Sequence, residues 1–208
     1  MHGTFFDIGL GAGLAAACGL RPFLPVLLAG ALASGETLDV SFVHDPFRFL
    51  EDDWWLFVVV AALLIAYVLQ LFLGQSALPE DGAERSRSTP LAAALAGLAY
   101  GAGAVLFAGT LAAHRDIWWP GLIGGLACVW LAQSAVLPLF VRARARLADG
   151  TAKQALTVYL DAVSLLLAAL VALLHPLGYV ALALLAWLLL RTRARGEQKY
   201  AGLRILRR

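Results

Sequence analysis

Charged residues are scarce in this sequence. Only 14% of its 208 residues are charged, whereas 61% are hydrophobic. A typical soluble domain is about one quarter charged and about half apolar. The composition therefore excludes an ordinary soluble protein and favours one that is embedded in a membrane.

The chain also lacks the motifs of soluble enzymes. It contains no Walker loop, no Gly-x-Ser-x-Gly elbow and no His-Glu-x-x-His pair, the patterns that position phosphates, nucleophiles and catalytic zinc. Its two cysteines, Cys18 and Cys128, lie inside apolar blocks. We therefore expect no disulfide, no metal, no cofactor and no nucleic-acid partner, and the sequence gives no sign of an enzyme.

Long uncharged blocks are what the chain has instead. Residues 54–74, 91–113 and 118–141 contain no charged side chain. Each block reaches the ~20 residues that an α-helix needs to cross ~30 Å of hydrocarbon. Alanine and leucine dominate the blocks, without the alternation that a membrane-spanning strand requires. The sequence thus predicts an all-α integral membrane protein.

Two further apolar regions, 5–33 and 156–190, are longer than one span needs, about 43 and about 50 Å as straight helices. Gly19, Pro22 and Pro25 predict that the first helix is broken near Arg21. The turn residues at 175–178 predict a reversal in the second region. We therefore expect a single polytopic domain of six spans, at about 5–33, 54–74, 91–113, 118–141, 156–174 and 177–190, followed by a basic tail at 191–208.

The charges between the spans predict their orientation. The loop at 142–153 and the tail are strongly basic, whereas residues 34–53 include six acidic residues and one arginine. Because basic loops face the cytoplasm, we expect both termini and the 75–88 loop to be cytoplasmic, in a cell membrane. The tryptophan pairs at 54–55 and 118–119 then begin helices at the outer interface, which indole rings prefer.

Six spans would also allow two inverted halves of three helices each, as in inverted-repeat transporters. The best internal match aligns Gly11 with Gly124 and the Leu-Pro pair at 24–25 with the pair at 137–138.

Arg21 is the first candidate for a functional role. A charge near the middle of a span costs at least ~2.5 kcal/mol on insertion scales, and the nearby prolines free backbone carbonyls beside it. An unwound stretch next to a guanidinium suits an anionic solute or a lipid headgroup. Asp161, the only formal charge between residues 156 and 190, is the expected partner. The alternative is that this pair only fixes the helix register.

Three more polar residues complete the candidate substrate-binding set. Tyr159, Gln133 and Ser134 lie at membrane depth and belong to the site only if they converge on Arg21. The alternative is that each makes a hydrogen bond between helices.

Two features predict partners other than a substrate. Glycines recur four residues apart, at 9 and 13, 97 and 101, and 121 and 125, a spacing that serves tight helix packing within the bundle or a homo-oligomer seam. The basic tail is expected to lie on anionic lipid.

The run Gly-Leu-Arg-Pro-Phe-Leu-Pro at 19–25, with the glycine- and alanine-rich stretch before it, resembles the opening of a bacterial membrane family of unknown function, DUF4126. The pattern at 159–190, an acidic residue before a long apolar stretch, is similar to that family's end. After the second span the family pattern has acidic and lysine residues, whereas this chain has Gln70, Gly74 and Gln75. The resemblance covers about a third of the chain and implies a small multi-pass membrane protein without an established activity.

Three functions fit these observations. The first is a small transporter or channel-like protein with its site at the broken first helix. The second is a non-catalytic membrane scaffold or assembly protein, in which the Arg21 pair only builds the bundle. The third, an intramembrane lipid enzyme, would need a nucleophile or base set that converges near Asp161.

Overall fold

The structure is a computed structural model that describes residues 3–35, 47–74, 90–113, 118–147 and 150–205. Within these residues it has seven α-helices, one short 3₁₀ helix and no strand, which confirms the predicted all-α class. The helices are α1 (Thr4–Leu20), α2 (Phe23–Ser34), η1 (Arg48–Glu51), α3 (Asp53–Gly74), α4 (Pro90–Ala112), α5 (Trp119–Ala145), α6 (Gly150–Leu173) and α7 (Leu177–Ile205).

Three of the described helices are long and apolar enough to cross a bilayer, namely α4 from Ala93 onward, α5 and α6. α1, α2 and the first part of α3 are apolar but shorter. Length and composition thus support three of the six predicted spans directly. Residues 36–46 and 75–89, which belong to two of the predicted loops, lie outside the described residues.

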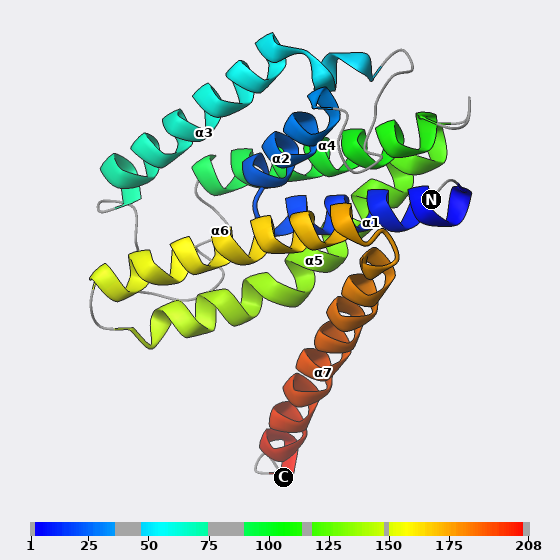
Figure 1. Ribbon diagram of the computed structural model, residues 1–208. Helices are drawn as coiled ribbons and strands as arrows, with labels where there is room; N and C mark the ends of the chain where they lie inside the picture. The colour runs from blue at the N-terminus through cyan, green and yellow to red at the C-terminus, as the bar shows by residue number, and fades with distance from the viewer. Residues whose placement is uncertain (1–2, 36–46, 75–89, 114–117, 148–149, 206–208) are drawn as a thin grey trace.

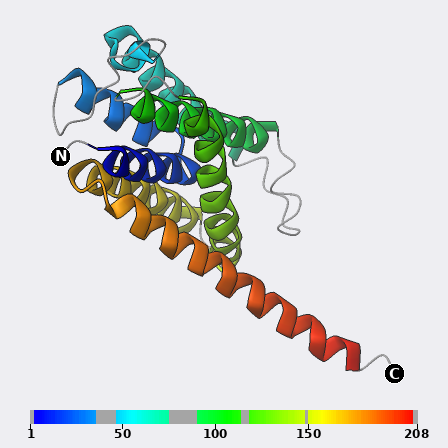
Figure 2. The same cartoon turned by 90° about the vertical axis from the view of Figure 1, so that its right-hand side faces the viewer.

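α1 is the central helix of the bundle. Every residue from Gly9 to Gly19 is buried, and α4, α5, α6 and α7 pack around it (Figures 1 and 2). Small residues make this possible, since Gly11 lies against Phe107 of α4 and Gly19 lies against Ala132 of α5. A helix that is apolar on all sides is expected at such a central position.

α1 and α6 run antiparallel in a regular register. Residues of α6 that recur every three to four positions, and so share one face of the helix, lie against α1. The contacts, in order along α1, join Gly9 with His175 in the turn after α6, Gly13 with Val171, Ala17 with Ser164, and Arg21 with Asp161.

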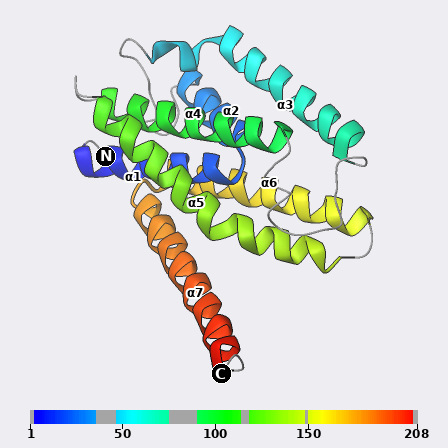
Figure 3. The same cartoon turned by 180° about the vertical axis from the view of Figure 1, so that it is seen from behind.

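The chain breaks and reverses at Arg21 and Pro22. A residue before proline avoids the α region, and Arg21 is extended, with φ −149° and ψ 123°. Pro22 and Pro25 also lack the N–H groups that would bond to the carbonyls four residues earlier and so continue the helix. α2 then runs back toward the end of the bundle where α1 began (Figures 1 and 3). The predicted break is confirmed, and we call residues 4–34 the α1–α2 hairpin.

α7 is longer than the predicted sixth span. It is one helix from Leu177 to Ile205, so the predicted span at 177–190 and most of the tail are continuous. Its first half packs against α1 and α5, and its second half leaves the bundle (Figures 1 to 3). At the end of its apolar part the Arg191 guanidinium lies 4.9 Å from the centre of the Trp187 ring, a cation–π pair of the kind that suits a membrane interface.

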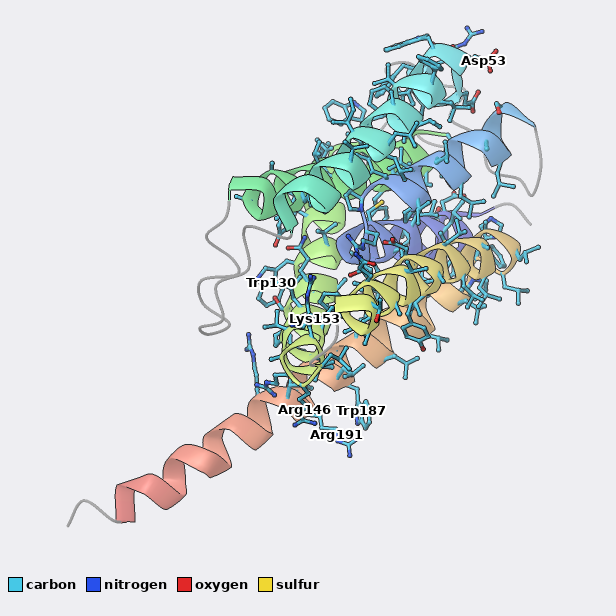
Figure 4. All side chains as sticks on the ribbon, turned by 90° about the vertical axis from the view of Figure 1, so that its left-hand side faces the viewer. Asp53, Trp130, Arg146, Lys153, Trp187 and Arg191 are labelled. Carbon is cyan, nitrogen blue, oxygen red and sulfur yellow. The ribbon has the colours of Figure 1, made fainter. Side chains whose placement is uncertain are left out.

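Acidic and basic residues gather at opposite ends of the bundle. Glu51, Asp52 and Asp53 lie where α3 begins, beside Phe47, whose ring is 6.1 Å from that of Trp118. We call this the acidic end, and the N-terminus and the α6–α7 turn lie there too (Figure 1). Where α5 ends and α6 begins lie Arg142, Arg144, Arg146 and Lys153, and we call this the basic end. Figure 4 shows Arg146 and Lys153 well away from Asp53.

The three glycine pairs differ in what they contact. Gly9 and Gly13 lie against α6, α7 and the turn between them, and Gly121 and Gly125 lie against the backbone of α4. The other pair, at 97 and 101, has no neighbouring atom within 4 Å of the position of an added Cβ. Tight packing is confirmed for two pairs, and a homo-oligomer seam stays a prediction.

The internal match between the two halves of the chain is not reflected in the helices. The Leu-Pro pair at 24–25 lies in the first turn of α2, whereas Pro138 lies inside the uninterrupted helix α5. The alignment therefore sets a helix start against a helix interior.

Candidate functional site

Arg21 and Asp161 form an ion pair between the tip of the α1–α2 hairpin and the middle of α6. The Nε atom of Arg21 lies 2.5 Å from Oδ1 of Asp161, and the two side chains are only 19% and 10% exposed. The pairing predicted from the sequence is confirmed. A substrate-binding role for either residue stays a prediction.

Backbone contacts hold the tip of the hairpin against α6. The carbonyl oxygen of Ala17 accepts hydrogen bonds from the Arg21 N–H and from the Ser164 hydroxyl, both at 3.1 Å. Ser164 and Asp161 are three residues apart and so share one face of α6. The last turn of α1 and the Arg21 side chain are therefore tied to the same helix.

The predicted helix-break residues all lie at this junction. Gly19 packs against α5, Pro22 precedes the first residue of α2, and Pro25 is buried in the first turn of α2. Because a proline in the first turn removes only an N–H that has no helical partner, the second helix can begin directly after the break.

A small recess lies beside the ion pair, with walls from the start of α2, from α3 and from α4. It encloses about 20 Å³, and an ordered water needs ~10–15 Å³. The recess therefore has room for one compact group between a charged pair and apolar walls. Its lining residues are Arg21, Pro22, Phe23, Leu24, Leu63, Ala66, Leu95 and Asp161.

The other predicted site residues do not converge on Arg21. Tyr159 is 67% exposed. It lies on the opposite side of α6 from Asp161, because residues two positions apart on an α-helix are separated by about 200° around its axis. Gln133 and Ser134 are half-buried on α5, and neither lines the recess.

Four described polar side chains are buried, and three of them were not predicted as site residues. They are Asp7, Thr110, Asp161 and Ser164, and each belongs to α1 or packs against it. Ser164 could have been found by its spacing of three residues from Asp161. Thr110 gives no such signal, since its hydroxyl bonds to the Phe107 carbonyl of its own helix at 2.9 Å.

The chemistry of this junction is that of a guanidinium with more donors than its carboxylate partner uses. A guanidinium has five N–H donors, more than the two oxygens of one carboxylate can satisfy in a single geometry, so Arg21 can donate hydrogen bonds to a further acceptor group. Among the described residues no group of histidine, cysteine or carboxylate side chains is arranged to hold a metal ion. What the described residues of the junction form is an ion pair.

A family model matches part of the chain. Residues 8–78 match the model of a family described as Domain of unknown function (DUF4126), a segment that includes Arg21 and both prolines of the break, whereas Asp161 lies outside it. No curated protein and no solved structure matches the chain. The resemblance at 9–25 is thus confirmed, and the one at 159–190 stays a prediction. The first third of the chain is similar to the DUF4126 family, whose function is unknown.

Proposed function

We propose that this chain is a small multi-pass membrane transporter or channel-like protein that brings an anionic solute or lipid headgroup to Arg21. The observation that carries the proposal is the Arg21–Asp161 pair beside a recess at a helix break. Breaks at mid-membrane are where many transporters bind their substrates. In this proposal Asp161 holds the guanidinium while the site is empty, and an incoming anion competes with it.

The α1–α2 hairpin supports the proposal because it is too short to reach the basic end. Asp161 lies 12 residues before Leu173, the end of α6, which corresponds to about 18 Å of a hydrocarbon layer of about 30 Å. The hairpin would enter from the acidic end, turn at Arg21 and leave by the same end. Non-helical backbone at such a depth is tolerated where protein buries it or water reaches it.

This arrangement predicts an N-terminus outside and a C-terminus inside, in place of two cytoplasmic termini. With Cys18 and Cys128 replaced by alanine, we expect cysteines introduced at Gly3 and Ser34 to react with an impermeant maleimide on intact cells. A cysteine at Arg193 should react only after permeabilisation, because basic segments face the cytoplasm. Labelling of residue 3 from the inside alone would show that α1 begins at the cytoplasmic face.

Anion flux tests the function itself. In proteoliposomes loaded with chloride, nitrate or phosphate, Arg21→Gln is expected to slow efflux at least about tenfold, since a hydrogen bond to a charged group is worth roughly 1.5–3 kcal/mol. Arg21→Lys keeps the charge but loses the planar fork. Its efflux rate should therefore fall between those of the wild type and Arg21→Gln. Arg191→Gln is the control, because it removes one arginine away from the recess.

A scaffold role is the second candidate, favoured by the complete burial of Gly9–Gly19 and by the small size of the recess. Native mass spectrometry of the purified protein separates the two. A bound anion or lipid that is lost in Arg21→Gln supports the transport proposal and identifies the substrate class. Identical, ligand-free spectra for both proteins, together with no flux, would contradict transport and support the scaffold.

A further inference from the structure

We infer that the polar face of α6 is the entry path by which a compact anion reaches Arg21 from the basic end, with Lys153 and Thr157 as its first two contacts. This inference rests on the proposed function and assigns to that site a direction of access and a size of substrate.

The path follows from where the α1–α2 hairpin stops. Lys153, Thr157, Asp161 and Ser164 follow one another at spacings of four, four and three residues, so they share one face of α6. It is the same face that α1 covers from Ser164 to Val171. Past Asp161 the hairpin has ended, and the face continues toward the basic end without it.

Exposure along this face changes at the tip of the hairpin. Ser164 and Asp161 are buried, whereas Thr157 and Lys153 are half-buried. Thr157 lies about 24 Å along the helix from Leu173, inside a hydrocarbon layer of about 30 Å, whereas Lys153 lies about 30 Å from it, at the edge of that layer. The gradient from half-buried to buried therefore describes a route that water enters from the basic end and that closes at the ion pair.

The residues are arranged in the order that an entering anion requires. Lys153 lies between the ends of α5 and α6, nearer the centre of the end-on view than Arg146 or Arg191 (Figure 4), where its charge can raise the local anion concentration. The Thr157 hydroxyl bonds to the Lys153 carbonyl at 3.1 Å and still has lone pairs and a rotatable proton. Arg21 is the end of the route.

The size of the recess limits the substrate class. A space of about 20 Å³ suits an anion of roughly the size of a water molecule, such as a halide. Anions with bulky substituents would require the walls formed by Leu63, Ala66 and Leu95 to move apart.

Chloride flux in proteoliposomes tests the path. Lys153→Gln is expected to slow flux about three- to tenfold at low salt, with a smaller effect at high salt where the charge is screened. Thr157→Val is expected to slow it about threefold at any salt concentration. Arg193→Gln and Thr192→Val are the matched controls on α7, because Arg193 is exposed there and the Thr192 hydroxyl also bonds to a carbonyl of its own helix. Neither should change the rate.

Cysteine accessibility tests the path without any transport. In the background lacking both native cysteines, Thr157→Cys should react with a small water-soluble thiol reagent added at the basic end, and its neighbour Val158→Cys, which is exposed on the bundle surface, should not. Equal reactivity at both positions, or none at 157, would overturn the path. If 157 reacts but wild type shows no flux, the proposed function fails; if Arg21→Gln slows flux while Lys153→Gln and Thr157→Val match their controls, this inference alone fails.

Discussion

Asp161→Asn is expected to lower the free energy of unfolding by about 3–5 kcal/mol, because removing one partner of a buried ion pair leaves the other charge uncompensated. Arg21 has no inexpensive way to become neutral, since a guanidinium stays protonated. The measurement is unfolding of the purified protein in mild detergent, monitored by tryptophan fluorescence.

The converse substitution, Arg21→Gln, should lower the free energy of unfolding by less than Asp161→Asn does. In Arg21→Gln the amide nitrogen can still donate a hydrogen bond to the carboxylate of Asp161, which offsets part of the penalty of an unpaired buried charge. The double variant Arg21→Gln/Asp161→Asn should be more stable than Asp161→Asn alone. If the two single effects simply add, the pair is not coupled and the ion pair is not what fixes the hairpin tip to α6.

The sequence predicted the helical class, the break and the ion pair for identifiable reasons. Long uncharged blocks have few alternatives to membrane helices, and Pro22 forces the residue before it out of the helix. Arg21 and Asp161 were matched because formal charges are rare in these apolar segments. Each of these inferences uses a local pattern or a scarce residue.

The direction of the chain after the break could not be predicted in this way. Hydropathy is the same whether the segment after Pro22 continues across the membrane or turns back, so residues 5–33 were expected to cross once. What sends α2 back is its packing against α3 and α6, which depends on residues far along the chain. The buried positions of Asp7 and Ser164 depend on the same tertiary contacts.

The glycine pairs show the same limit of sequence patterns. The spacing at 97 and 101 is identical to that at 9 and 13 and at 121 and 125, yet only the last two pairs face another helix. A spacing of four residues defines a face of a helix but does not identify what that face meets. The neighbour of each glycine is decided by the topology of the bundle.

Gly178→Ala is therefore expected to be strongly destabilising, whereas Gly97→Ala is not. A methyl group on Gly178 would overlap the backbone oxygen of Gly9, and neither backbone can move without separating α7 from the central helix α1. We expect a loss near the upper end of the ~1–3 kcal/mol typical of overpacking. Gly97 has open space around it, so alanine there should leave stability unchanged or raise it by up to about 1 kcal/mol through better helix propensity. Thermal unfolding of the two variants in the same detergent gives the comparison, and equal melting temperatures would contradict the close contact between α1 and α7.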